Sequence, residues 1–296
     1  MRRQTLAALA FVLAAPACVL AADAWIPYRL DFNHVVFDLV QTGARDGWAV
    51  GERGLITHFD GGKWQPVDSP VGVPLFAVAF PEATHGWAVG AEGTIIEYVN
   101  GQWNEAARPD KWHLMSLAYT SSNDVWAVGE HGSIVHYDGR QWKVVASPKK
   151  VALNRVFFNR ANDGWAVGNQ GVILHYDGKT WKEVPGAGNS TLYGVAFRDA
   201  VDGWAVGERG TVLHYDGKSW SSVASPASQT FLSASFVRGG DGYIVGRGGS
   251  VFRLRNGKWS AVEGPPTRKT LFVVAASIDG QPWVAATTRD IFKRRS

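Results

Sequence analysis

An all-β chain closed into a ring of repeated sheets is the fold class that this sequence predicts, on three observations. Six copies of one pattern open with an aromatic residue, at one constant interval: Trp48, Trp87, Trp126, Trp165, Trp204 and Tyr243. Each copy closes with a tryptophan at the same interval: Trp64, Trp103, Trp142, Trp181, Trp220 and Trp259. Between these positions, β-branched and aromatic segments alternate with Gly, Asp, Asn and Pro, as in short strands joined by turns. A period of about 40 residues with such segments predicts a β-propeller of four-stranded antiparallel blades.

Four strands are expected in each copy, and the copy opened by Trp165 illustrates them. We predict strands over 153–158, 164–168, 172–176 and 181–184. The first strand has equivalents in five other copies: 36–40, 75–80, 114–119, 192–197 and 231–236. Asp-Gly pairs join the third strand to the fourth, and we expect tight hairpins with positive φ at both turn positions: Asp138-Gly139, Asp177-Gly178 and Asp216-Gly217.

Successive turns of an antiparallel meander alternate between the two faces of the ring. The joints between copies and the GxxG hairpins after each second strand are expected on one face, which we call the joint face. The Asp-Gly-Trp turns and the Asp-Gly hairpins are expected on the other, which we call the turn face.

The seventh copy is incomplete and predicts how the ring closes. It supplies three strands but no closing tryptophan: 271–276, 283–287 and 291–293. The strands of this copy follow those of the sixth copy at an interval one residue longer than that between the other copies, so we place a one-residue insertion near Gly264-Pro265-Pro266. Trp25 precedes Trp64 by the interval of the other copies and so belongs to the closing series. We therefore expect seven blades, the last completed by an N-terminal strand within 23–30, because closure protects free sheet edges.

The segment 1–22 is typical of a secretory signal peptide, which leaves 23–296 as one propeller domain. Arg2 and Arg3 precede an apolar stretch at 6–17. We expect an exported protein, cleaved after one of three small residues: Ala21, Ala22 or Ala24. A lipoprotein anchored at Cys18, the only cysteine, is the alternative. No later apolar run reaches the ~20 residues that a membrane helix requires.

Charge and motifs exclude several function classes. Without Arg2 and Arg3, the 30 basic residues fall to 28 against 26 acidic ones, which does not favour nucleic acid or an anionic membrane as partner. The sequence contains no GxSxG, HExxH or P-loop motif. We expect a protein that is not an enzyme, needs no cofactor or metal and is a monomer.

The repeated residues are interpreted as framework. Tryptophans present in every copy are expected to wedge adjacent sheets together rather than form a row of ligand platforms. Four histidines share one repeat position, and we expect structural hydrogen bonds, because equivalent strands of packed sheets lie ~10 Å apart: His58, His136, His175 and His214. Three glutamates in the GxxG hairpins are expected to serve as polar turn residues: Glu52, Glu130 and Glu208.

Departures from the repeat are the better site candidates. The joint at 108–113 is charged and carries Trp112, the one tryptophan outside the repeat. An exposed tryptophan among basic groups favours a protein or anion contact, whereas ordinary loop charges with Trp112 folded onto the rim are the alternative. The candidate partner-binding face comprises Arg53, Arg108, Lys111, Trp112, Lys149, Lys150, Arg209, Arg247, Arg268, Lys269 and Arg289.

The repeated GWAVGxxGxIxxYDGxxW pattern resembles that of the photosystem II stability/assembly factor propellers and their bacterial relatives with BNR-like repeats, over 25–296. The resemblance implies an exported, non-enzymatic propeller, in a periplasm or a thylakoid-lumen-like compartment, that helps to assemble or stabilise a membrane protein complex. It also implies partner binding through an arginine-bearing face, with Arg53, Arg209 and Arg247 as counterparts. An Asp-box has five steps from Asp to Trp, whereas Asp177 and Trp181 are four apart.

Two other functions remain open at this point. A secreted carbohydrate-active propeller is the rival, because sialidases share the fold, although their arginine triad and Tyr–Glu pair cannot be located. The carboxylates to test for that activity are Asp31 and Asp110, which lie outside the repeat. A cell-surface binding module without chemistry is the third possibility.

Overall fold

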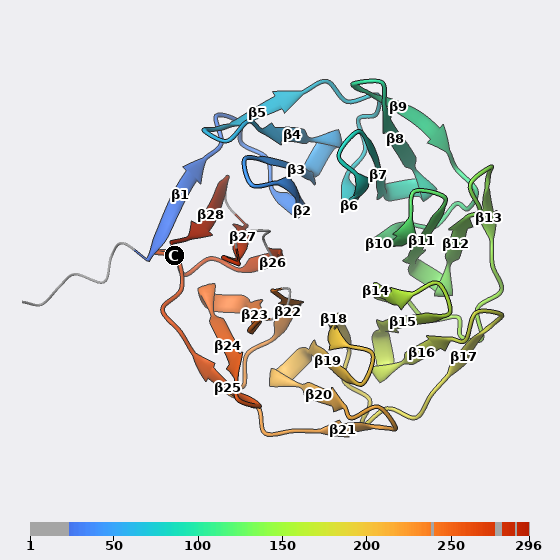
Figure 1. The fold of residues 1–296 in the computed structure, drawn as a ribbon, viewed down its shortest axis with the longest axis vertical. Coiled ribbons are helices and arrows are strands. Elements are labelled where there is room, and N and C mark those ends of the chain that lie inside the picture. Colours follow the sequence, from blue (N-terminus) through green and yellow to red (C-terminus); the bar gives the residue numbers. More distant parts are fainter. Residues whose placement is uncertain (1–23, 238–239, 276–279, 288, 296) are drawn as a thin grey trace, which may run out of the picture.

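Seven four-stranded antiparallel sheets stand around a central axis, as the sequence predicts (Figure 1). This computed structural model describes residues 24–237, 240–275, 280–287 and 289–295. The expected signal peptide and Cys18 lie outside the described residues. Among the described residues, no helix has the length and apolar character to cross a membrane.

Blades 1 to 4 each contain four consecutive strands. Blade 1 comprises β2 (Val36–Gly43), β3 (Asp46–Gly51), β4 (Ile56–Phe59) and β5 (Trp64–Val67). Blade 2 comprises β6 (Leu75–Glu82), β7 (His85–Gly90), β8 (Ile95–Val99) and β9 (Gln102–Ala107). Blade 3 comprises β10 (Leu114–Ser121), β11 (Asp124–Gly129), β12 (Ile134–Tyr137) and β13 (Trp142–Val144). Blade 4 comprises β14 (Leu153–Arg160), β15 (Asp163–Gly168), β16 (Ile173–Tyr176) and β17 (Trp181–Glu183).

The other three blades follow the same order until the ring closes. Blade 5 comprises β18 (Leu192–Asp199), β19 (Asp202–Gly207), β20 (Val212–Tyr215) and β21 (Trp220–Ser222). Blade 6 comprises β22 (Phe231–Phe236), β23 (Gly242–Gly246), β24 (Val251–Arg255) and β25 (Lys258–Ala261). Blade 7 comprises β26 (Leu271–Ala275), β27 (Trp283–Ala286), β28 (Asp290–Arg294) and β1 (Trp25–Arg29).

Closure by the N-terminal strand is confirmed. Strand β1 pairs with β28, with Trp25 opposite Arg294 and Arg29 opposite Asp290. Trp25 is buried, and its Nε1 donates a hydrogen bond to the carbonyl of Glu263, 2.9 Å away. In Figure 1, β1 lies along the outer edge of the sheet that contains the C-terminal strands.

A 3-10 turn follows the second strand of the first six blades, where the GxxG hairpins were expected. These turns are η2 (Glu52–Gly54), η3 (Ala91–Gly93), η4 (Glu130–Gly132), η5 (Asn169–Gly171), η6 (Glu208–Gly210) and η7 (Arg247–Gly249). The last glycine of each turn touches the following joint: a Cβ on Gly54 would lie 1.9 Å from the carbonyl oxygen of Val71. This close approach fixes hairpins and joints together on the joint face.

The expectation of positive φ at both Asp-Gly positions is wrong. At Asp138-Gly139, only the glycine has positive φ, and Tyr137 pairs with Trp142 across the loop. The carboxylate of Asp138 accepts hydrogen bonds from the backbone N–H groups of Arg140 and Gln141, each at 3.0 Å. The side chain therefore stabilises a wider turn, as Asp does in Asx-type turns.

The same hydrogen bonds from backbone N–H groups to a turn aspartate also favour its ionised form, as Asp60 shows. The backbone N–H groups of Lys63 and Gly62 and the side chain of Gln65 lower the pKa of Asp60 to about 2. Among the described residues, the hairpins between third and fourth strands that have positive φ at both turn positions are Asn-Gly turns instead: Asn100-Gly101 and Asn256-Gly257.

The repeated tryptophans form the core between blades, as predicted. The opening Trp48 is 4% exposed and contacts rings of the next blade, Phe80, Tyr98 and Trp103. The repeated histidines are structural: His175 Nε2 lies 2.9 Å from Asp163 Oδ1. Equivalent pairs recur at His58–Asp46, His136–Asp124 and His214–Asp202.

Candidate partner-binding surface

In each GxxG hairpin, the middle residue of the three-residue 3-10 turn projects from the joint face. Arg53 and Arg209 occupy this position with φ of 54° and 53°, and both side chains are exposed. Arg247, which the sequence placed with them, occupies the first hairpin position, because Gly248 fills the second with φ of 71°. The side chain of Arg247 is also exposed.

The joint at 108–113 packs against the hairpin of blade 3. The ring of Trp112 stacks on that of His131 with centroids 3.6 Å apart, and Lys111 Nζ lies 4.9 Å from the Trp112 ring. Trp112 is half-buried against this hairpin, and a partner contact at its accessible surface stays a prediction. Sequence reasoning missed His131, although it holds the same repeat position as Arg53 and Arg209.

The non-repeat carboxylate Asp110 has a structural role in this joint. Its Oδ2 accepts a hydrogen bond from Ser133 Oγ at 2.6 Å, and its Oδ1 accepts one from the backbone N–H of Lys111 at 2.7 Å. Asp31, the other carboxylate named for glycoside hydrolysis, is exposed. The described residues contain no group of three or more His, Cys, Asp or Glu side chains placed to hold a metal ion.

Two of the predicted cations on blades 2 to 4 are neutralised by neighbours. Arg108 Nε lies 2.7 Å from Glu105 Oε1, and its NH1 atom lies 3.8 Å from Glu92 Oε2. Lys149 Nζ lies 2.9 Å from Glu183 Oε2. Lys150 is exposed beside it. Paired charges of this kind offer little to a charged partner.

The remaining predicted cations belong to blades 5, 6, 7 and 1, and we call them the basic arc: Arg53, Arg209, Arg247, Arg268, Lys269 and Arg289. Within the part of the chain that the structure describes, none of them forms an ion pair with an acidic side chain. A Cβ on Gly249 would lie 2.1 Å from the carbonyl oxygen of Thr267, so the hairpin bearing Arg247 rests on the joint bearing Arg268 and Lys269.

Acidic side chains beside the basic arc are occupied by local hydrogen bonds. Glu52 Oε2 accepts from the backbone N–H of Val35 at 3.0 Å, and Glu208 Oε1 accepts from the hydroxyl of Tyr193 at 3.0 Å. Burial, and after it Glu208, raises the pKa of Tyr193, whereas the nearby Arg247 lowers it. Among the described residues, six predicted cations without ion-pair partners thus lie on the joint face of blades 5, 6, 7 and 1, whereas two of the four on blades 2 to 4, Arg108 and Lys149, are paired.

A channel of about 450 Å³ runs between the first strands of the blades and holds an ion pair with a buried carboxylate and a partly exposed guanidinium. Asp38 of blade 1 has an 8% exposed side chain, and its Oδ1 lies 4.0 Å from NH1 of Arg155, which projects from blade 4. Asp38 Oδ2 accepts a hydrogen bond from the backbone N–H of Val78 at 3.1 Å. Burial raises the pKa of Asp38, and the charge of Arg155 opposes that shift.

Sequence reasoning missed both charged channel residues. Both occupy one repeat position, and its residue differs from copy to copy: Asp38, Ala77, Ser116, Arg155, Gly194, Ser233 and Val273. The opposite charges in copies 1 and 4 were the signal that could have revealed the pair. A β-bulge between Val36 and Asp38 turns this position toward the channel, which alternation alone does not predict.

Together these features define the class: a seven-bladed β-propeller of four-stranded antiparallel blades, with the cations of the basic arc on its joint face. The family model described as "Photosynthesis system II assembly factor YCF48" matches residues 98–177, which confirms the resemblance expected from the repeat. No curated protein matches the chain.

Solved structures of similar shape come from proteins of different activities. The chain is similar to "YCF48 bound to D1 peptide" at 16% identity, with a TM-score of 0.78 over 93% of this chain and 97% of that one. It is similar to YCF48 from Cyanidioschyzon merolae at 17% identity, with a TM-score of 0.75 over 92% and 99%. Streptogramin B lyase gives a TM-score of 0.82 at 13% identity over 92% and 97%. At these identities the likeness shows the fold, and a fold shared with a lyase does not decide activity.

Proposed function

We propose that this chain is an exported, non-enzymatic scaffold that assists the assembly or stability of a membrane protein complex by binding one of its proteins. The basic arc is the single observation that carries this proposal, because its cations have no acidic partner among the described residues and three of them lie on rigid hairpins. The match to the photosystem II assembly factor family supports the class of partner. A structure of YCF48 bound to a D1 peptide supports a peptide as the bound form.

The proposed site is the joint face on blades 5, 6, 7 and 1, and the mature protein is a monomer without a cofactor. The arc steers an acidic or carboxylate-bearing segment, since unpaired arginines favour planar, bidentate contacts with carboxylates. Export rests on the signal peptide expected at 1–22, with lipidation at Cys18 as the alternative. Mass spectrometry of the N-terminus of the mature protein distinguishes these two forms.

A charge reversal tests the proposed surface. The Arg209→Glu/Arg247→Glu variant should recover at least about tenfold less of its membrane protein partner in a pull-down from host membranes, because two close charge contacts are lost. The matched control, Lys179→Glu/Lys218→Glu, makes the same charge change on the turn face and should retain binding. Equal recovery by both variants, or recovery of no membrane complex subunit by the wild type, contradicts the proposal.

A further inference from the structure

Four successive blade boundaries contain the same aromatic contact. A tyrosine at the end of the third strand packs on the opening tryptophan of the preceding blade, and its ring centroid lies 4.8 Å from that tryptophan in every case: Tyr98–Trp48, Tyr137–Trp87, Tyr176–Trp126 and Tyr215–Trp165. The closing tryptophan of the same blade forms a second wall, with Trp220 at 5.4 Å from Tyr215. At these boundaries the repeat therefore forms a slot for one phenol ring, and a tyrosine of the chain itself occupies it.

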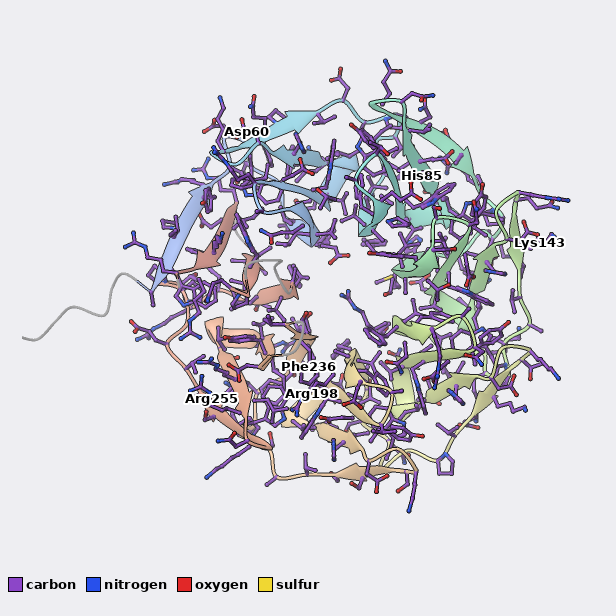
Figure 2. The ribbon with its side chains drawn as sticks, viewed as in Figure 1. Asp60, His85, Lys143, Arg198, Phe236 and Arg255 are labelled. Carbon is purple, nitrogen blue, oxygen red and sulfur yellow. The ribbon has the colours of Figure 1, made fainter. Side chains whose placement is uncertain are left out.

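The boundary between blades 5 and 6 departs from this rule. Leu254 replaces the tyrosine and is buried in one core cluster with Trp204 and Trp259. Among the described rings, Trp204 contacts only His214, at 4.4 Å, and Trp259, at 5.4 Å. A pocket of about 650 Å³ opens at this boundary, larger than the central channel. We call it the blade 5–6 pocket. Figure 2 shows Arg198 and Phe236 side by side at this boundary, where Arg198 lies 5.5 Å from the Phe236 ring.

The blade 5–6 pocket shares two aromatic walls with the position that tyrosine fills at the four regular boundaries, and it lies beside Leu254, which does not line it. Trp204 and Trp259 supply aromatic surface, Asp202 and His214 supply polar edges, and the loop at 223–226 closes one side. None of the basic arc residues lines it. The pocket is thus a separate feature from the surface proposed above.

The carboxylate of Asp202 in the lining of the pocket favours a phenol over a purely apolar ring, because it can accept a hydrogen bond. At the filled boundary, burial and then the negative charges of Asp163 and Asp216 raise the pKa of Tyr215. In the blade 5–6 pocket, Asp202 takes the place of Asp163. Its Oδ1 accepts from Trp204 Nε1 at 2.7 Å, and its Oδ2 lies 3.2 Å from NH1 of Arg198. A carboxylate accepts further bonds, so a phenol O–H has a partner there.

We propose that the blade 5–6 pocket binds a tyrosine side chain of a protein partner, beside Leu254 and on the same two tryptophan walls that hold the chain's own tyrosine at the four regular boundaries. The bound ring would lie on Trp204 and against Trp259, with its hydroxyl toward Asp202. The volume of the pocket leaves room for the peptide backbone beside the loop at 223–226, in the size range of ordinary ligand sites. This inference does not depend on the basic arc or on the identity of the membrane complex.

Saturation-transfer NMR with N-acetyl-L-tyrosinamide tests the pocket on the mature protein. Wild type should bind this probe in preference to N-acetyl-L-leucinamide. Leu254→Tyr restores the repeat and should weaken binding about tenfold or more, because the new side chain occupies the slot. Leu254→Met leaves the slot open and should bind as the wild type does. No binding to the wild type, or unchanged binding to Leu254→Tyr, overturns the proposal.

A reciprocal variant and a smaller probe sharpen the result. Tyr215→Leu should open an equivalent slot beside Trp165 and raise the number of bound probes from one to two. If that variant does not fold, as judged by circular dichroism, the two Leu254 variants still decide. p-Cresol lacks the peptide groups and should bind more weakly than N-acetyl-L-tyrosinamide; stronger binding of p-cresol overturns the assignment to a protein side chain.

Discussion

At the residue scale, one carboxylate explains why Asp, Trp and His recur at fixed spacing. Asp163 Oδ1 accepts a hydrogen bond from Trp165 Nε1 at 3.0 Å and lies 2.9 Å from His175 Nε2. The carboxylate thus satisfies an indole N–H at the margin of the core. In blade 2 the acid and the base are exchanged: His85 Nε2 lies 2.7 Å from Glu97 Oε1. The pair survives, but Trp87 Nε1 is buried without a hydrogen-bond partner among the described residues.

The first prediction restores that missing acceptor. His85→Asp/Glu97→His recreates the arrangement of blade 4 and should raise the free energy of unfolding by about 1 kcal/mol, because a buried unsatisfied N–H costs about that much or more. Urea unfolding at pH 7 measures the change. The single variant His85→Asp places a new carboxylate against that of Glu97 and should be less stable than the wild type. A double variant no more stable than the wild type contradicts the explanation.

At the element scale, the sequence could predict the strands and their closure because both follow from the period. The constant register of the repeat places Trp25 with Trp64, and β1 forms where that register requires it. The shape of the Asp-Gly hairpins could not be predicted in the same way. Asp138 accepts two backbone N–H groups through its side chain, and this bonding competes with the tight turn that Asn256-Gly257 adopts.

The candidate site was predictable only as a set of residues on one face. Turn alternation places Arg53 and Lys149 together on the joint face, but which cations are paired depends on side-chain contacts, such as that of Lys149 with Glu183 of the next blade. Trp112 could be recognised because it lies outside the repeat. The histidine that stacks on it, His131, was missed because it occupies an ordinary repeat position. Asp38 was missed because a bulge, not alternation, directs it inward.

The second prediction concerns the closing strand. A chain that begins at Val35 lacks β1 and exposes the edge of β28, so it should melt several degrees below a chain that begins at Ala24. Loss of the buried Trp25 alone is expected to cost about 3–5 kcal/mol, as for other core aromatic residues. Differential scanning calorimetry of the two chains makes the comparison. Equal melting temperatures would show that β1 does not hold the ring closed.

At the scale of the whole molecule, the ring brings residues from distant blades into one electrostatic environment. Blades 1 and 4 lie on different sides of the axis (Figure 1). Nevertheless, NH1 of Arg155 and Oδ1 of Asp38 lie 4.0 Å apart within the channel. Asp124, by contrast, lies on the turn face: burial opposes its ionisation, but hydrogen bonds from His136, Thr120 and Trp126 outweigh burial and lower its pKa. The two aspartates therefore link folding to pH with opposite sign.

The third prediction follows from that opposition. The raised pKa of Asp38 means that the folded chain holds a proton there above pH ~3.9, where the unfolded chain has released it. The wild type therefore loses stability as pH rises from about 4 through the raised pKa, and Asp38→Asn should lack this loss. Its free energy of unfolding, relative to the wild type, should increase over that window.

Asp124→Asn supplies the matched control for this titration. The lowered pKa of Asp124 stabilises the fold fully above pH ~3.9, and that contribution disappears as pH falls through the lowered value. Asp124→Asn should therefore be less stable than the wild type at pH 7, and the deficit should shrink in acid. Urea unfolding at a series of pH values compares the two variants. If both show the same pH trend, the burial of Asp38 in the channel is not the source of the first effect, because a general change in net charge would act alike on either aspartate.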